Sequence, residues 1–102
     1  MRLQEITSPK LIFLLEAVLD EFAVAEEYGS FYSTHEGYAV MLEEFEELWD
    51  AIKANKDGAM HLEAIQMAAT VMRFLVDCCD VELLRVILEQ KRRNKEIFGE
   101  KK

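Results

Sequence analysis

The sequence predicts an all-α fold in which four helices pack as an antiparallel bundle. Apolar residues recur at helical spacing in four segments of the 102 residues. The connections between these segments are short, and short connections place consecutive helices antiparallel to one another. The third segment is apolar around most of its circumference, so protein must surround it. Together these features predict a single helical domain over residues 1–102, with 91–102 a basic C-terminal tail.

The first helix is expected to begin at Thr7, Ser8 and Pro9. A hydroxyl there can cap free backbone N–H groups, and proline is tolerated in the first turn, where its missing N–H has no helical acceptor. Gly29 is the expected stop. The apolar stripe of this helix consists of Leu11, Ile12, Leu14, Leu15, Val18, Leu19, Phe22 and Ala25. The opposite side of this helix is expected to be a solvated face. It consists of Glu16, Asp20, Glu21, Glu26 and Glu27.

A capping box marks the start of the second helix near Thr34. Ser33 and Glu36 have the spacing at which each side chain can bond to the other's backbone N–H. Just before them, Phe31 and Tyr32 either cap the core or stack on a planar ligand. The apolar stripe of this helix consists of Tyr38, Met41, Leu42, Phe45, Leu48, Trp49 and Ile52. Its acidic face consists of Glu36, Glu43, Glu44, Glu46, Glu47 and Asp50.

The acidic face of the second helix has two interpretations. Carboxylates three or four positions apart are neighbours on a helix and repel each other, which costs a few tenths of a kcal/mol per pair. Since almost no basic residue precedes Lys53, this face is either solvated or neutralised by a bound cation. The net charge of −8 argues against binding of nucleic acid, because a phosphate track needs a positive surface.

The third helix is the centre of the predicted fold, with Asp57 as its expected cap. Between Leu62 and Asp77 the polar residues are Glu63, Gln66, Thr70, Arg73 and Asp77. At 100° per residue they fall within about 80° of the helix circumference. This narrow stripe is either a solvated edge or the lining of a polar cleft between helices. The apolar remainder is too extensive for three neighbours from so short a chain to cover, so we expect at least a dimer.

The fourth helix is expected to begin after Asp80, whose carboxylate can accept from the N–H groups of Glu82 or Leu83. Its apolar edge consists of Val81, Leu84, Ile87 and Leu88. Beyond Gln90 the sequence becomes basic, which is the reason for the predicted tail.

Further expectations concern the cell compartment. Cys78 and Cys79 are expected to be buried, reduced thiols, because a bridge between adjacent cysteines is strained. The sequence shows no apolar run long enough to span a membrane and no secretory signal pattern. We therefore expect a cytoplasmic protein without a membrane partner.

Two elements on successive helices suggest chemistry. Glu44 and Glu47 lie three positions apart on the second helix, and Glu63 and Gln66 lie three positions apart on the third. Antiparallel packing can bring the two pairs together. Oxygen ligands of this type suit Mg²⁺ or Mn²⁺, which keeps open positions for substrate phosphates.

This pattern resembles the E-x-x-E, spacer, E-x-x-D signature of the all-alpha nucleoside triphosphate pyrophosphohydrolases. That superfamily includes MazG-like proteins, dimeric dUTPases and phosphoribosyl-ATP pyrophosphohydrolases. The matching segments are residues 42–48 and 63–66, with Gln66 where the family has aspartate. The resemblance implies a MazG-like helical homodimer or homotetramer. It also implies Mg²⁺-dependent or Mn²⁺-dependent cleavage of a nucleoside triphosphate to the monophosphate and pyrophosphate.

By position, the resemblance makes Glu44, Glu47 and Glu63 the metal ligands of the catalytic site. Gln66 is then a weaker ligand or positions a water molecule. Glutamine at position 66 lacks the negative charge of the family's aspartate, and either Asp50 or Asp77 could supply that charge.

Two further residues are candidates for substrate binding. Arg73 lies on the same helix stripe as Glu63. It either contacts the triphosphate or pairs with a carboxylate, that of Asp77 at the next turn or one on another helix. His35, together with Phe31 and Tyr32, is a candidate for contact with the base.

A second hypothesis belongs to another functional class. The chain would then be a non-catalytic helical module that retains the same fold and binds a partner protein through the polar stripe or the basic tail. Divalent metal distinguishes the two hypotheses, because converging carboxylates bind it and a solvated face does not.

Overall fold

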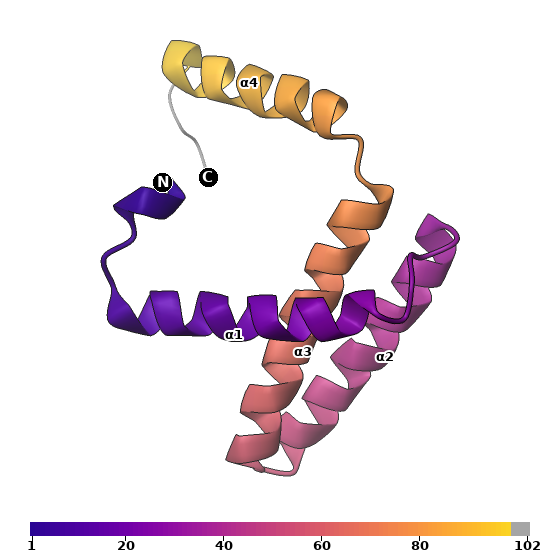
Figure 1. Cartoon of the computed structure of the whole chain (residues 1–102). Coiled ribbons are helices and arrows are strands. Elements are labelled where there is room, and N and C mark those ends of the chain that lie inside the picture. The colour runs from indigo at the N-terminus through magenta and orange to yellow at the C-terminus, as the bar shows by residue number, and fades with distance from the viewer. Residues whose placement is uncertain (99–102) are drawn as a thin grey trace.

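The computed structural model describes residues 1–98 of the chain. They form a short 3-10 helix, η1 (Leu3–Glu5), and then α1 (Pro9–Glu26), α2 (Thr34–Lys53), α3 (Asp57–Cys78) and α4 (Val81–Phe98), as Figure 1 shows. The predicted all-α class with four α-helices is therefore confirmed for this part of the chain. None of these helices combines the length and the apolar character that a membrane span requires.

Local side-chain bonds explain where three of the helices begin. The Ser8 hydroxyl accepts from the N–H of Leu11 at 3.2 Å, and Ser33 accepts from the N–H of Glu36 at 3.2 Å. The Asp80 carboxylate accepts from the N–H of Leu83 at 3.1 Å. Since each cap satisfies an N–H group that the helix leaves free, these starts follow from the local sequence.

Two boundaries differ from the prediction. The cap position of α3 belongs to Lys56, and Asp57 is already the first helical residue. α4 continues through Phe98, so residues 91–98 of the predicted basic tail are helical. Residues 99–102 of the tail lie outside the described part. The helix continues because Arg92 pairs with both Glu89 and Glu96, and such pairs stabilise a helix at these spacings.

α3 is the centre of the fold. It packs against α2, which runs antiparallel beside it, and against α1, which crosses it (Figure 1). Among the residues that the structure describes, α4 packs against none of the other helices. A single chain therefore places three helices together and leaves the fourth apart, so it does not close the expected four-helix bundle by itself.

The contact between α2 and α3 is close at Gly37. This buried glycine faces the ring of Phe74, and a Cβ atom at position 37 would lie 2.5 Å from Cδ1 of that ring. The small buried side chains of Ala51 and Ala69 also lie in these two helices. Small residues thus let the two helix backbones approach each other.

We expect Gly37→Ala to lower the free energy of unfolding by up to about 2 kcal/mol. Overpacking costs about 1–3 kcal/mol, whereas alanine is favoured over glycine in a helix by about 1 kcal/mol. Gly58→Ala is the matched control, because nothing lies within 4 Å of a Cβ atom there. Urea unfolding should show Gly37→Ala below wild type and Gly58→Ala at or above it. Equal stability of the two variants would contradict the close contact.

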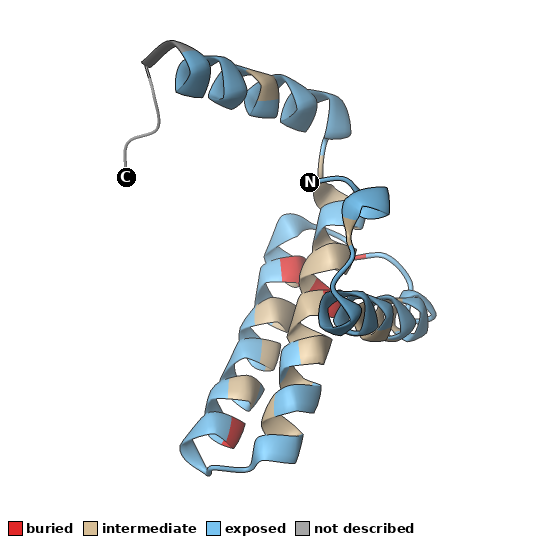
Figure 2. Cartoon of the chain, turned by 90° about the vertical axis from the view of Figure 1, so that its left-hand side faces the viewer, coloured by how far each residue is buried: buried red, intermediate tan, exposed pale blue. Residues whose placement is uncertain are grey.

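The chain exposes a large surface for its size. Its accessible surface is 8441 Å², whereas a compact monomer of this mass exposes about 5,900 Å². Its radius of gyration is 16.5 Å, against about 13 Å for a compact domain of this length. Figure 2 shows how few positions are fully buried, and Leu62 and Val76 of the central helix are exposed. The chain by itself therefore leaves many apolar side chains exposed.

Candidate metal centre

Three carboxylates converge where α2 and α3 lie side by side. Glu44 and Glu47 lie one turn apart on α2, and Glu63 lies on α3. Each offers one carboxylate oxygen, and these three oxygens lie within 4.8 Å of one another. The antiparallel packing of the two helices thus brings together the three residues predicted as metal ligands.

Two of these carboxylates are partly buried and incompletely bonded. One oxygen of Glu44 and one oxygen of Glu63, Oε2 in each case, are shielded from solvent and have no hydrogen-bond partner among the described residues. A buried polar atom without a partner is costly unless something else satisfies it. A bound cation would satisfy both atoms.

The close approach of these groups changes their protonation. Burial raises the pKa of Glu44, and the carboxylates of Glu47 and Glu63 raise it further. Burial also raises the pKa of Glu63, with a second contribution from Glu47. Both shifts favour the neutral acid, which means that the charged cluster is unfavourable without a cation.

These shifts predict how the stability of the metal-free protein depends on pH. Because the folded state holds protons on Glu44 and Glu63 more tightly than the unfolded state, both groups reduce stability as the pH rises from their ordinary value of 4.5 through their raised pKa values. The variant Glu44→Gln/Glu63→Gln should lack this part of the pH dependence. Melting temperatures measured from pH 4 upward with a chelator present would test it, and parallel profiles for the two proteins would contradict it.

A cavity of about 240 Å³ adjoins the carboxylate cluster at Glu44. It is enclosed by side chains from α1, α2 and α3, and Glu44 belongs both to its wall and to the carboxylate cluster. Three residues of the predicted polar stripe line it, namely Gln66, Thr70 and Arg73. Much of the stripe thus lines a cleft between helices. The other lining residues are Glu21, Val24, Ala25, Tyr28, Val40 and Ala69.

Gln66 lies next to the cluster on α3, one turn after Glu63. It is half-buried, and its backbone carbonyl accepts from the Thr70 hydroxyl at 2.9 Å. This bond occupies the backbone of Gln66 and leaves its side-chain amide beside the cavity. The amide can therefore act on a ligand or a water molecule there.

Arg73 and Asp77 hold the loop between α1 and α2. Arg73 Nη2 donates to the carbonyl of Gly29 at 2.6 Å, and the guanidinium lies 4.1 Å from the ring centroid of Phe31. Asp77 Oδ2 accepts from the N–H of Phe31 at 3.0 Å and lies 4.0 Å from Arg73 Nε. Of the two predicted roles for Arg73, the structure shows the pairing with Asp77, while the residue also lines the cavity.

Other candidate residues lie away from this cluster. His35 is exposed in the first turn of α2 and is not among the residues that line the cavity. Phe31 is buried and caps the core, whereas Tyr32 is almost fully exposed. Asp50 is exposed and pairs with Lys53 at 3.5 Å. Asp77 is bonded to the loop. Neither Asp50 nor Asp77 therefore belongs to the three grouped carboxylates.

Sequence reasoning missed one residue of the site. Glu21 was predicted to lie on the solvated face of α1, yet it is half-buried in the cavity wall, and its charge contributes to the raised pKa of Glu44. A signal was present, because the helix neighbours of Glu21 at positions i−3 and i+4 are the apolar Val18 and Ala25. Glu21 is therefore at the edge of the apolar stripe.

Cys78 and Cys79 are free thiols at the end of α3, and both are partly exposed rather than buried. Their position at the junction with α4 leaves them away from the carboxylate cluster.

Comparison of the chain with family models, with curated proteins and with solved structures found no match. The resemblance to the pyrophosphohydrolases therefore depends on the motif residues alone. The convergence of Glu44, Glu47 and Glu63 is an observation independent of that resemblance.

Proposed function

We propose that this chain is a Mg²⁺-dependent or Mn²⁺-dependent nucleoside triphosphate pyrophosphohydrolase of the MazG-like type, acting as a homodimer or homotetramer. One observation carries the proposal. Glu44, Glu47 and Glu63 offer oxygens within 4.8 Å of one another, although the two helices that supply them are separate in the sequence.

The donor set fits a hard divalent cation. Mg²⁺ binds through a few carboxylates and keeps other positions for water and substrate phosphates. The unpartnered oxygens of Glu44 and Glu63 supply such ligands, and Glu47 adds a third carboxylate from the exposed side. When bound, the metal would neutralise phosphate charge and lower the pKa of a water molecule.

The adjoining cavity suits part of a nucleotide. Its volume of about 240 Å³ is slightly below the range of roughly 300–1,000 Å³ for ligand pockets. The phosphates would lie at the Glu44 end, near the cluster. The amide of Gln66 would orient water or a phosphate oxygen, and the apolar side chains of Val24, Ala25 and Val40 would contact the nucleoside.

Arg73 would act mainly by fixing this end of the site. Its bonds to Gly29 and its contact with Phe31 hold the loop that joins α1 to α2, so they fix the wall of the cavity that α1 provides. We include Arg73 as a positioning residue that faces the substrate, and we leave the exposed His35 outside the site.

Product analysis tests the proposed activity. The full chain would be incubated with a panel of ribonucleoside and deoxyribonucleoside triphosphates, with Mg²⁺ or Mn²⁺ and with a chelator as control. Chromatography should show a nucleoside monophosphate and pyrophosphate from at least one substrate, and the chelator should remove both products. Release of a nucleoside diphosphate and inorganic phosphate, or no turnover of any substrate, would contradict the proposal.

A non-catalytic interaction module is the second candidate. Two observations favour it: Gln66 replaces a carboxylate of the motif, and large apolar side chains such as Tyr38, Phe45 and Trp49 are exposed on α2. This candidate predicts no stabilisation by divalent metal.

A further inference from the structure

α4 is an amphipathic helix that lies away from the rest of its own chain (Figure 1). Its exposed apolar face consists of Val81, Leu83, Leu84, Ile87 and Leu88. At 100° per residue these side chains cover about 160° of the circumference. A helix with such a face gains most of its stability from packing against a partner.

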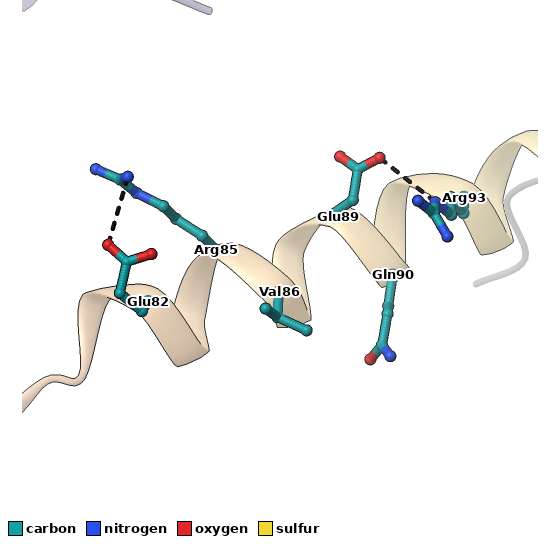
Figure 3. A pocket seen from close by; sticks show the side chains of 6 residues that line it. All are labelled: Glu82, Arg85, Val86, Glu89, Gln90 and Arg93. Carbon is teal, nitrogen blue, oxygen red and sulfur yellow. Dashed lines mark ion pairs between the residues drawn. The ribbon is translucent and has the colours of Figure 1, made fainter.

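The opposite face of α4 is already satisfied within the helix. Figure 3 shows Glu82 pointing to Arg85 and Glu89 pointing to Arg93, each pair at 3.5 Å. Arg92 pairs with Glu89 on the same face. Since these charges neutralise one another in water, this face suits solvent, and the apolar face is the one that needs a partner.

α2 offers a matching surface, which we call the α2 seam. It consists of Tyr38, Leu42, Phe45, Trp49 and Ile52, which are 40% to 62% exposed. Their spacing alternates between four and three residues, as in helices that pack side by side. The buried Gly37 and Ala51 lie on a different side of α2. The seam is about 21 Å long, which the length of α4, about 27 Å, can cover.

Charge selects α4 over another α2 as the partner of this seam. α2 carries six carboxylates and one lysine, so two α2 helices packed together would repel each other. α4 carries five basic and three acidic residues and is the one helix with a net positive charge among the four described α-helices. Lys91 continues the edge formed by Val81, Leu84 and Leu88, where it can meet the carboxylates of α2.

The connection between α3 and α4 directs α4 away from its own chain. Only Cys79 and Asp80 separate the two helices, and Cys79 has an extended backbone. A short hinge of this kind favours exchange of the following element between copies. The surface in excess of a compact monomer is about 2,500 Å² per chain, or about 5,000 Å² for two chains, which is also in the range that obligate dimers bury in total.

We propose that α4 is exchanged between two copies of this chain, and that its apolar face packs against the α2 seam of the second copy. The two contacts are equivalent by symmetry, so both α4 helices gain a partner. The inference rests on the proposed self-association, but not on the proposed hydrolysis. Glu44 and Glu63 lie between α2 and α3, on another side of α2, so the exchange leaves the carboxylate cluster open.

Trp49 is the single tryptophan of the chain and lies in the α2 seam, so its fluorescence reports on the proposed contact. The wild type should sediment as a dimer of the 11.8 kDa chain at micromolar concentration, with the emission of a buried indole. Leu84→Glu/Leu88→Glu should sediment as a monomer with emission shifted to the red. Val86→Glu is the matched control, because Val86 is an exposed apolar residue that lies about 60° outside the apolar face at 100° per residue. This variant should behave as the wild type.

A mixing experiment shows whether the contact lies between copies. The Leu84→Glu/Leu88→Glu chain, which retains Trp49, would be refolded with an excess of Trp49→Phe, which has no tryptophan and an intact α4. Emission should shift back to the blue, because α4 of the second chain covers the seam of the first. No shift on mixing would overturn the proposal, as would a monomeric wild type or a Leu84→Glu/Leu88→Glu variant that remains a dimer with unchanged emission. None of these outcomes depends on nucleotide hydrolysis.

Discussion

Glu63→Gln is expected to raise the melting temperature of the metal-free protein and to remove both the proposed stabilisation by metal and the proposed hydrolytic activity. Glutamine has nearly the shape of glutamate and carries no charge, so it relieves the repulsion that Glu47 exerts on Glu63 and that Glu63 exerts on Glu44. The same change removes one of three anionic ligands. Since even the outer partners of metal ligands contribute 10-fold to 100-fold, we expect hydrolysis to fall by about 100-fold or more.

Glu46→Gln is the matched control for this variant. Glu46 is an exposed glutamate on α2, and it does not belong to the grouped carboxylates. Thermal melting and product analysis of both variants would be measured with and without Mn²⁺. Glu63→Gln should differ from Glu46→Gln both in melting temperature and in product formation. Equal effects of the two substitutions would mean that the general acidity of α2 is responsible, and Glu63 would have no place in a metal site.

Gln66→Asp is expected to strengthen metal binding and to increase hydrolysis. It restores the fourth carboxylate of the motif beside Glu63, and an added charge near a bound cation is worth about 1–4 kcal/mol. We therefore expect about a fivefold or greater gain in affinity for Mg²⁺. Without metal, the new carboxylate should lower the melting temperature, because it adds charge to a cluster that burial already disfavours.

Gln66→Asn separates charge from shape, because asparagine has the length of aspartate without its charge. It should bind Mg²⁺ no better than the wild type. Isothermal titration with Mg²⁺ and melting at saturating metal would measure both effects. If Gln66→Asp loses stability that neither Mg²⁺ nor Mn²⁺ restores, then the new charge is buried without a cation, and the interaction module becomes the better account.

The local features of this fold were predictable because they depend on near neighbours in the sequence. The caps at Ser8, Ser33 and Asp80 each use a side chain three positions from its bonded N–H. The basic residues from Lys91 onward were predicted to form a tail, and residues 91–98 belong to α4. Their spacing, three and four positions from the glutamates Glu89 and Glu96, instead supports a helix.

The arrangement of the helices was less predictable. Helical periodicity shows that α4 has an apolar face, but it does not show which surface covers that face. The sequence therefore suggested a bundle within one chain, and the structure leaves α4 apart from the other described helices. The contact of Arg73 with Gly29, 44 positions away, is equally long-range, and nothing in the sequence predicted it.

The candidate site was predictable to the extent that its spacing is regular. Glu44 and Glu47 share one face of α2, and the short connection to α3 makes that helix return beside them, so Glu63 meets them. The motif could not predict that Glu21 lines the cavity, because the motif covers only α2 and α3 and Glu21 lies on α1. The crossing of α1 over α3 depends on tertiary packing.

Thermal melting of the wild-type chain with and without Mg²⁺ or Mn²⁺ tests the central claim most directly. A ligand that binds only the folded state stabilises it by about 2.7 kcal/mol at one hundred times its dissociation constant. If Glu44, Glu47 and Glu63 hold a cation, millimolar metal should therefore raise the melting temperature by several degrees. An unchanged melting temperature with both metals would contradict the claim that these three carboxylates form a metal centre.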